Sequence, residues 1–137
     1  MLTAPNMDLS TLLPANGGDG SLGVTLFGAE INDRSGAAVH VIGDLNGDGF
    51  DDVLIGAPSA GEAYLVFGDD DWSASPTLDL ATLNGTNGFT FSGVDANFGS
   101  IGEAVSSAGD VNGDTFADLL LGGWRTGPGG QTQCGAG

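Results

Sequence analysis

The sequence has no lysine, and its only basic residues besides His40 are Arg34 and Arg125. Against 18 acidic residues, this leaves a formal net charge of −16 on 137 residues. Such a chain repels polyanions, which excludes general binding to nucleic acid or to an anionic membrane surface. The excess charge predicts either a well-solvated acidic face or neutralisation by bound cations.

The features of cross-linked and membrane-spanning proteins are also missing. Cys134 is the single cysteine, so no disulfide can form within the chain. The longest apolar runs, such as residues 119–121, are far too short to cross a bilayer, which argues against membrane insertion. The N-terminus has neither a basic start nor a sustained apolar stretch, so no signal peptide is expected.

Long helical periodicity is absent, and the pattern is that of short strands. The 26 glycines follow no collagen period and fit many tight turns. Apolar or alternating runs at 53–57, 63–68, 89–93 and 104–109 each end in glycine or are followed by proline or acidic turn residues. These are strand and turn signals.

The chain also repeats itself. Residues 35–57 align with residues 101–123 at an offset of 66, and MDLSTL at 7–12 resembles LDLATL at 78–83. Each repeat holds about four short strands, and four-stranded units in series predict the blades of a β-propeller. We therefore expect an all-β fold of antiparallel four-stranded blades, with one full blade and partial blades at its ends.

The most acidic part of each repeat has a regular spacing of oxygen ligands. In DLNGDGFDD, residues 44–52, oxygen-bearing side chains occupy positions one, three, five and nine, and the same holds in DVNGDTFAD, residues 110–118. The carbonyl of position seven can supply a further oxygen. Hard oxygen ligands without sulfur or imidazole favour Ca²⁺, about two ions per chain. The candidate metal ligands are Asp44, Asn46, Asp48, Phe50, Asp52, Asp110, Asn112, Asp114, Phe116 and Asp118.

Two alternatives compete with this interpretation. An EF-hand loop requires a bidentate glutamate at position 12, where this chain has Ile55 and Leu121, so the EF-hand is rejected. The acids could also be solvated turn residues, because Asp, Asn and Gly are common in turns. The recurrence of the same spacing in both copies favours the ion.

The two loops differ at position six, which is Gly49 in the first and Thr115 in the second. If that position needs a positive φ, the β-branched threonine is strained by about 1 kcal/mol or more. The second loop is then expected to bind its ion more weakly, by roughly tenfold.

GDLNGDGFDDVLIGAP followed by GEAYLVFG resembles an FG-GAP repeat. Such repeats build the N-terminal β-propeller of integrin α subunits and related propellers of bacterial extracellular proteins. The resemblance implies that each acidic loop joins the first two strands of a blade and holds one structural Ca²⁺. It further implies an extracellular or cell-surface module for adhesion or protein–protein interaction.

The resemblance divides the chain into three parts. Residues 1–36 form an N-terminal segment with the outer strand of a preceding blade, residues 37–93 the full blade with loop 44–52, and residues 94–137 a partial second repeat with loop 110–118. Fewer than two repeats leave strand edges open, and open edges invite pairing with a protein partner or another copy.

The remaining hypotheses are a self-assembling structural protein whose blades are completed between chains, and an accessory propeller of a secreted hydrolase. No nucleophile motif such as GxSxG is present, and His40 lies in a strand-like run, AAVHVIG. We therefore expect that the chain is not an enzyme.

Overall fold

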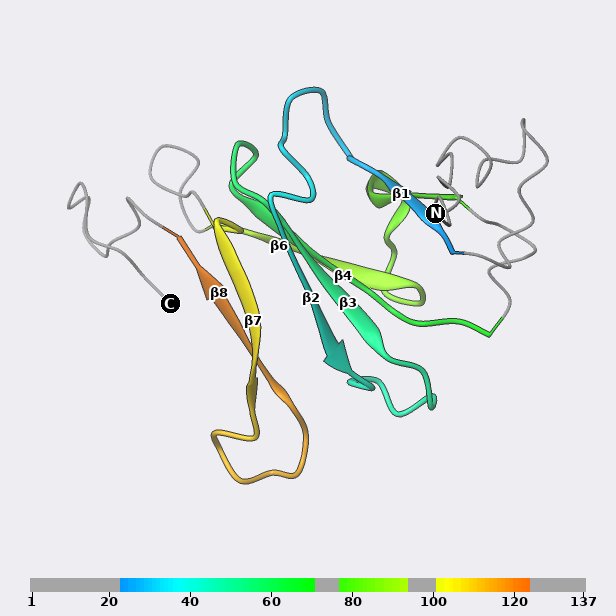
Figure 1. The fold of residues 1–137 in the computed structure, drawn as a ribbon, viewed down its shortest axis with the longest axis vertical. Coiled ribbons are helices and arrows are strands. Elements are labelled where there is room, and N and C mark those ends of the chain that lie inside the picture. The colour runs from blue at the N-terminus through cyan, green and yellow to red at the C-terminus, as the bar shows by residue number, and fades with distance from the viewer. Residues whose placement is uncertain (1–22, 71–76, 94–100, 124–137) are drawn as a thin grey trace, which may run out of the picture.

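The computed structural model describes residues 23–70, 77–93 and 101–123 (Figure 1). Apart from one 3-10 turn, all the regular secondary structure of these residues is β-strand, which confirms the all-β prediction. The elements are β1 (Thr25–Phe27), β2 (Ala38–Gly43), β3 (Asp52–Ala57), β4 (Glu62–Val66), β5 (Thr77–Asp79), the short 3-10 helix η3 (Leu80–Thr82), β6 (Gly88–Ser92), β7 (Ala104–Gly109) and β8 (Asp118–Gly122).

The central unit is a four-stranded antiparallel sheet in the order β2-β3-β4-β6. The four strands have the same order along the chain and across the sheet, which is the meander of a propeller blade, although β5 and η3 lie between β4 and β6 in the sequence. In β3, five of the six residues are buried, and burial does not alternate along it. The continuous apolar run of β3 therefore reflects burial on both faces of the sheet.

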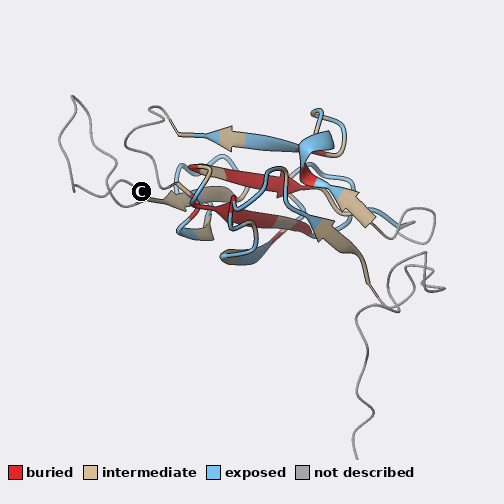
Figure 2. Ribbon diagram, turned by 90° about the horizontal axis from the view of Figure 1, so that it is seen from above, coloured by how far each residue is buried: buried red, intermediate tan, exposed pale blue. Residues whose placement is uncertain are grey.

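One face of this sheet is covered by the N-terminal strand and by the connection between β4 and β6. Ile55, Tyr64 and Val66 form a buried cluster with Leu80 of η3. Leu26 of β1 and Leu78 of β5 pack against the same cluster. Figure 2 shows the buried residues concentrated in the middle strands, between outer layers that are more exposed.

The other face is covered by the hairpin of β7 and β8, which forms a separate two-stranded antiparallel sheet. Leu54 and Leu65 are buried here together with Ile42. Val105, Leu119 and Leu121 of the hairpin, with Leu45, Phe67 and Phe91, pack against them. Two sheets thus stack face to face, as neighbouring propeller blades do, and the prediction of a partial β-propeller is confirmed.

A parallel pairing that the sequence did not predict joins β1 to β5, in the register Thr25↔Thr77, Leu26↔Leu78 and Phe27↔Asp79. The β4–β6 connection thus reaches back and adds a strand to the edge of β1. Asp79 then begins η3, since its side chain accepts a hydrogen bond from the Ala81 amide at 2.9 Å.

The two stacked sheets approach most closely at a pair of glycines. A Cβ atom added to Gly56 of β3 would overlap the carbonyl oxygen of Gly102, just before β7. A Cβ atom at Gly102, where φ is +93°, would in turn overlap the Glu62 carbonyl. Only glycine fits at this backbone contact, which sets the spacing of the two sheets.

Some predictions concern residues outside the described part of the chain, namely residues 1–22, Cys134 and the rest of the tail from 124. The three-part division of the chain stays a prediction. Within the described ranges, no helix has both the length and the apolarity to cross a membrane.

We predict that Gly56→Ala lowers the free energy of unfolding by about 1–3 kcal/mol, because the new methyl group forces the two sheets apart. Gly122→Ala at the equivalent position of β8 is the matched control. In the part of the chain that the structure describes, its Cβ atom would meet only Ala104, at 3.3 Å and beyond, so a change within about 0.5 kcal/mol is expected. Urea titrations of dilute protein measure both values, and equal losses in the two variants would contradict the role of the glycine contact.

Candidate metal centre

The two acidic loops occupy the same place in their sheets. Loop 44–52 connects β2 to β3, and loop 110–118 connects β7 to β8. Both hairpins extend their loops toward the same side of the molecule (Figure 1). A register shift precedes each loop, between Val41 and Gly43 and between Ser107 and Gly109. Each loop thus leaves the ladder through a bulge, which turns the chain sharply.

In the first loop, the carboxylate of Asp44 organises the turn. Its Oδ1 accepts hydrogen bonds from the amides of Gly47 at 2.6 Å and Asp48 at 3.1 Å. Its Oδ2 accepts from the Gly49 amide at 2.8 Å. Three successive N–H groups therefore point at one side chain, so the loop curls around position one.

Positions three and five continue the curl. The Asn46 side-chain oxygen accepts from the Asp48 amide at 2.9 Å, and Asp48 Oδ1 accepts from the Phe50 amide at 2.9 Å. The Asn46 amide group also donates to Asp48 Oδ2 at 2.7 Å. The alternate side chains at positions one, three and five therefore all turn back onto their own loop.

The second loop has nearly the same hydrogen bonds. Asp110 accepts from the amides of Gly113, Asp114 and Thr115 at 2.6, 3.0 and 2.8 Å. Asn112 accepts from the Asp114 amide, and Asp114 accepts from the Phe116 amide, each at 2.9 Å. The two loops, 66 residues apart in the sequence, thus adopt the same conformation.

Position nine differs between the loops. Asp52 is fully buried and accepts from the amides of Leu45 at 2.8 Å and Gly68 at 2.9 Å. It therefore ties its loop to the end of β4. Asp118 is only half-buried, and accepts from the Val111 amide at 2.8 Å and the Asn112 side chain at 3.2 Å.

The backbone at position six is left-handed in both loops, with φ of +94° at Gly49 and +80° at Thr115. Position four has φ of +81° in both copies, at Gly47 and Gly113. A β-branched residue is disfavoured at positive φ. The structure thus meets the condition on which the weaker second loop was predicted.

The donor set of each loop fits a hard cation, since every predicted ligand is an oxygen and the side chains at alternate positions curl inward. Within the described ranges, no group of three or more His, Cys, Asp or Glu side chains converges as a metal cluster. The predicted ligand set of each loop includes an asparagine and a backbone carbonyl besides its carboxylates. The ten ligand assignments remain predictions.

The only histidine lies away from these loops. His40 is exposed in the middle of β2, opposite Leu54 of β3. This position agrees with the interpretation of His40 as an ordinary strand residue.

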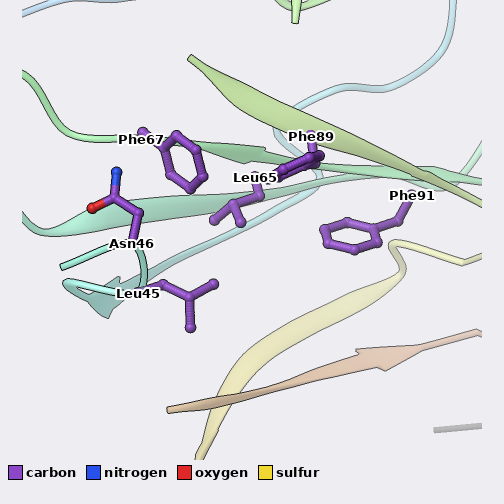
Figure 3. Close-up of a pocket in the computed structure, with 6 residues that line it drawn as sticks. All are labelled: Leu45, Asn46, Leu65, Phe67, Phe89 and Phe91. Carbon is purple, nitrogen blue, oxygen red and sulfur yellow. The ribbon is translucent and has the colours of Figure 1, made fainter. Parts of the chain in front are cut away.

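Beside the first loop lies an apolar hollow of about 500 Å³ (Figure 3). Phe67 and Phe89 meet edge to face there, with ring centroids 5.7 Å apart. No acidic side chain lines the hollow, so it is unsuited to a cation. The lining residues are Leu45, Asn46, Leu65, Phe67, Phe89 and Phe91.

Sequence reasoning missed a buried carboxylate in the β1–β2 connection. Asp33 accepts hydrogen bonds from the Ser35 amide and hydroxyl, each at 2.8 Å, and from the Glu30 amide at 3.1 Å. Burial acts to raise the pKa of Asp33, but these hydrogen bonds outweigh it and lower the pKa below its ordinary value. The D-x-S pattern of residues 33–35 was the available signal, because it is typical of a side-chain-capped turn.

A second missed contact lies within β4 of the central sheet. The Tyr64 hydroxyl donates to Glu62 Oε2 at 2.6 Å. Burial, followed by this hydrogen bond and the charge of Glu62, raises the pKa of Tyr64 well above its ordinary value. The hydroxyl is thus held as a donor within the sheet.

Known proteins with similar sequences show the family to which this chain belongs. The FG-GAP repeat family matches residues 35–71, which include the first loop and its flanking strands. The chain carries an integrin-type FG-GAP region. It is 34% identical over 100 residues to integrin alpha pat-2 of Caenorhabditis elegans and 30% identical over 114 residues to integrin alpha-3 of Mus musculus.

The FG-GAP region is a small part of these relatives. The two alignments cover 69% and 78% of this chain, but only 8% and 10% of the two integrin subunits. The fold and the repeat are therefore shared with integrin α subunits. The activity of a whole subunit does not follow from a match of this length.

We predict that Asp33 stabilises the fold in a pH-dependent way. Its pKa is lower in the folded than in the unfolded chain, so its contribution is present above its ordinary value of 3.8 and is lost as the pH falls through the folded value. Asp33→Asn should cost about 1–3 kcal/mol at neutral pH and flatten the acid side of the stability curve. Urea titrations from neutral to acidic pH measure this, and parallel curves for variant and wild type would exclude the role of Asp33.

Proposed function

We propose that this chain is a calcium-binding FG-GAP β-propeller module that serves extracellular adhesion or protein–protein interaction, with calcium in a structural role. The observation that carries the proposal is the pair of equivalent loops, each curled by its own carboxylates between the first two strands of a sheet. The match to the FG-GAP repeat and to integrin α subunits supports the same conclusion.

Calcium is the ion that the donor set favours. Each loop offers three carboxylates, an asparagine oxygen and a carbonyl, and no soft ligand. Ca²⁺ accepts six to eight oxygens at flexible angles, whereas Mg²⁺ demands a stricter octahedron. The ligands proposed for the first loop are Asp44, Asn46, Asp48, Asp52 and the Phe50 carbonyl, with the equivalent five in the second.

The bound ion would reduce the repulsion among the loop carboxylates in a chain whose formal net charge is −16. Asp52 already links the first loop to the end of β4 through the Gly68 amide. An ion at this loop would therefore stabilise the sheet as well as the turn. Calcium acts here as a fixed part of the fold, with no turnover assigned to it.

The relatives support a proposal for the type of partner and the place of action. Because the similar proteins are integrin α subunits, we infer a cell-surface or extracellular module that recognises another protein rather than an enzyme. The loop acids are engaged as acceptors for backbone amides, which leaves them ill suited to proton transfer. An accessory role beside a hydrolase has no specific observation in its favour.

Calcium binding is tested by calorimetric titration and by thermal unfolding with and without the ion. We expect two sites per chain with dissociation constants of about 0.1–1 mM, and a melting temperature that rises with free calcium. Asp48→Asn should abolish or strongly weaken one site, because it removes a ligand charge. Asp51→Asn removes an equal charge from an exposed residue of the same loop that is no ligand, and should leave both sites intact. Equal effects of the two substitutions would mean that general acidity, and not the loop geometry, attracts the ion.

The two loops are predicted to bind with unequal affinity. Thr115→Gly should tighten the second site by roughly tenfold, since glycine accepts the positive φ that threonine resists, provided that the loop relaxes without the ion. Gly49→Thr should weaken the first site by a similar factor. Titrations with the other loop silenced, by Asp48→Asn or Asp114→Asn, isolate each site. Unchanged affinities in both exchanges would show that the strain does not oppose binding.

A further inference from the structure

We propose that copies of this chain associate head to tail, with the β7–β8 hairpin of one copy packed on β2 and β3 of the next. The contact would repeat, between chains, the packing that already joins the two sheets within one chain. This inference rests on the proposed role in protein–protein interaction and names the partner as a second copy. It does not depend on calcium.

The template is the interface inside the chain. The face of the central sheet that carries Leu54, fully buried, packs against β7, and Val105 of β7 belongs to the same cluster. In the repeat, Leu54 corresponds to Leu120 of β8, and Val105 corresponds to Val39 of β2. Leu120 and Val39 could therefore make a contact equivalent to that of Leu54 with Val105, but they lie at opposite ends of the structure.

Both sides of this contact are exposed in the single chain. Val39 and Val41 of β2 are 59% and 57% exposed, and Leu120 is 47% exposed. In their repeat equivalents, these positions are half-buried or fully buried by the neighbouring sheet. Large apolar side chains exposed on a sheet face mark an interaction surface when they gather on one element. Placing Leu120 of one copy against Val39 and Val41 of the next buries all three.

The two glycines of the internal contact also have equivalents at the exposed sheets. Gly56 meets Gly102 inside the chain, and their repeat equivalents are Gly122 and Gly36. Among the described residues, a Cβ atom at Gly36 would meet nothing within 4 Å, and one at Gly122 would meet only Ala104. Gly122 of one copy and Gly36 of the next are thus free to make the same close backbone approach that fixes the spacing of the internal sheets.

Charge opposes this association at long range, because each copy carries −16. The contact itself is apolar, so screening by salt should strengthen it. A charge-driven complex would instead weaken with salt. The sign of the salt dependence therefore identifies the type of contact.

The decisive experiment uses complementary variants. Val39→Asp spoils the β2 end of a copy and leaves its Leu120 end intact, whereas Leu120→Asp does the reverse. Sedimentation or light scattering should show wild-type chains growing into larger species with concentration and salt, and each variant alone weakened by at least about tenfold. An equimolar mixture of the two variants should give a dimer that grows no further, because one intact contact remains and both outer ends are blocked.

The controls separate this geometry from other causes. Ile31→Asp places the same charge on a side chain that is 94% exposed in the β1–β2 connection, and should leave association unchanged. Gly122→Ala, expected to spare the fold, should weaken association as Leu120→Asp does. A wild-type chain that stays monomeric up to its solubility limit overturns the proposal. So does a mixture that stays monomeric, or a wild type that stops at a symmetric dimer.

Calcium titration of the same samples keeps this inference distinct from the proposed function. Val39→Asp and Leu120→Asp leave both loops unaltered and should bind calcium as the wild type does. Loss of association with intact calcium binding supports the head-to-tail contact. Self-association without any calcium binding would leave the contact standing and overturn the metal sites.

Discussion

The constraint on which this structure depends is that the central sheet is apolar on both faces. Leu54 and Ile55 are neighbours in β3, point to opposite faces, and are 0% and 3% exposed. Burial of each such side chain stabilises the fold by about 1.5–3 kcal/mol, so neither face can be left to water. One face is covered by β1, β5 and η3, and the other by the β7–β8 hairpin. The blade is therefore stable only as the middle layer of a stack. The exposed valines of β2 are apolar for the same reason, because they lie on a sheet face that requires a covering layer.

The sequence predicted what is determined locally. The apolar runs around Ile55 and Leu65 became β3 and β4, and the loops begin at Asp44 and Asp110 as their spacing indicated. Neighbouring strands in a meander pair with their sequence neighbours, so their order across the sheet needed no long-range information. The repeat supported the prediction of propeller blades, because a motif that recurs with the same spacing rarely arises by chance.

What escaped prediction depends on contacts between distant residues. The β1–β5 pairing joins Thr25 to Thr77, and a short parallel edge strand has no periodicity of its own to reveal it. The burial of Asp52 depends on the Gly68 amide, 16 residues away. Asp33 was passed over because it lies outside the repeated motif, although its hydrogen bonds to Ser35 are local.

The β1–β5 pairing has a consequence for how such a chain is divided. The connection between β4 and β6 belongs by sequence to one sheet, yet β5 completes the edge of the strand that precedes that sheet. Successive repeats are consequently joined by backbone hydrogen bonds between a strand of one repeat and a strand of the next. A cut at a repeat boundary severs a hydrogen-bonded ladder, while duplication or deletion of a whole repeat preserves every ladder in register. Gene duplication in steps of one repeat is therefore the change in length that this architecture tolerates best.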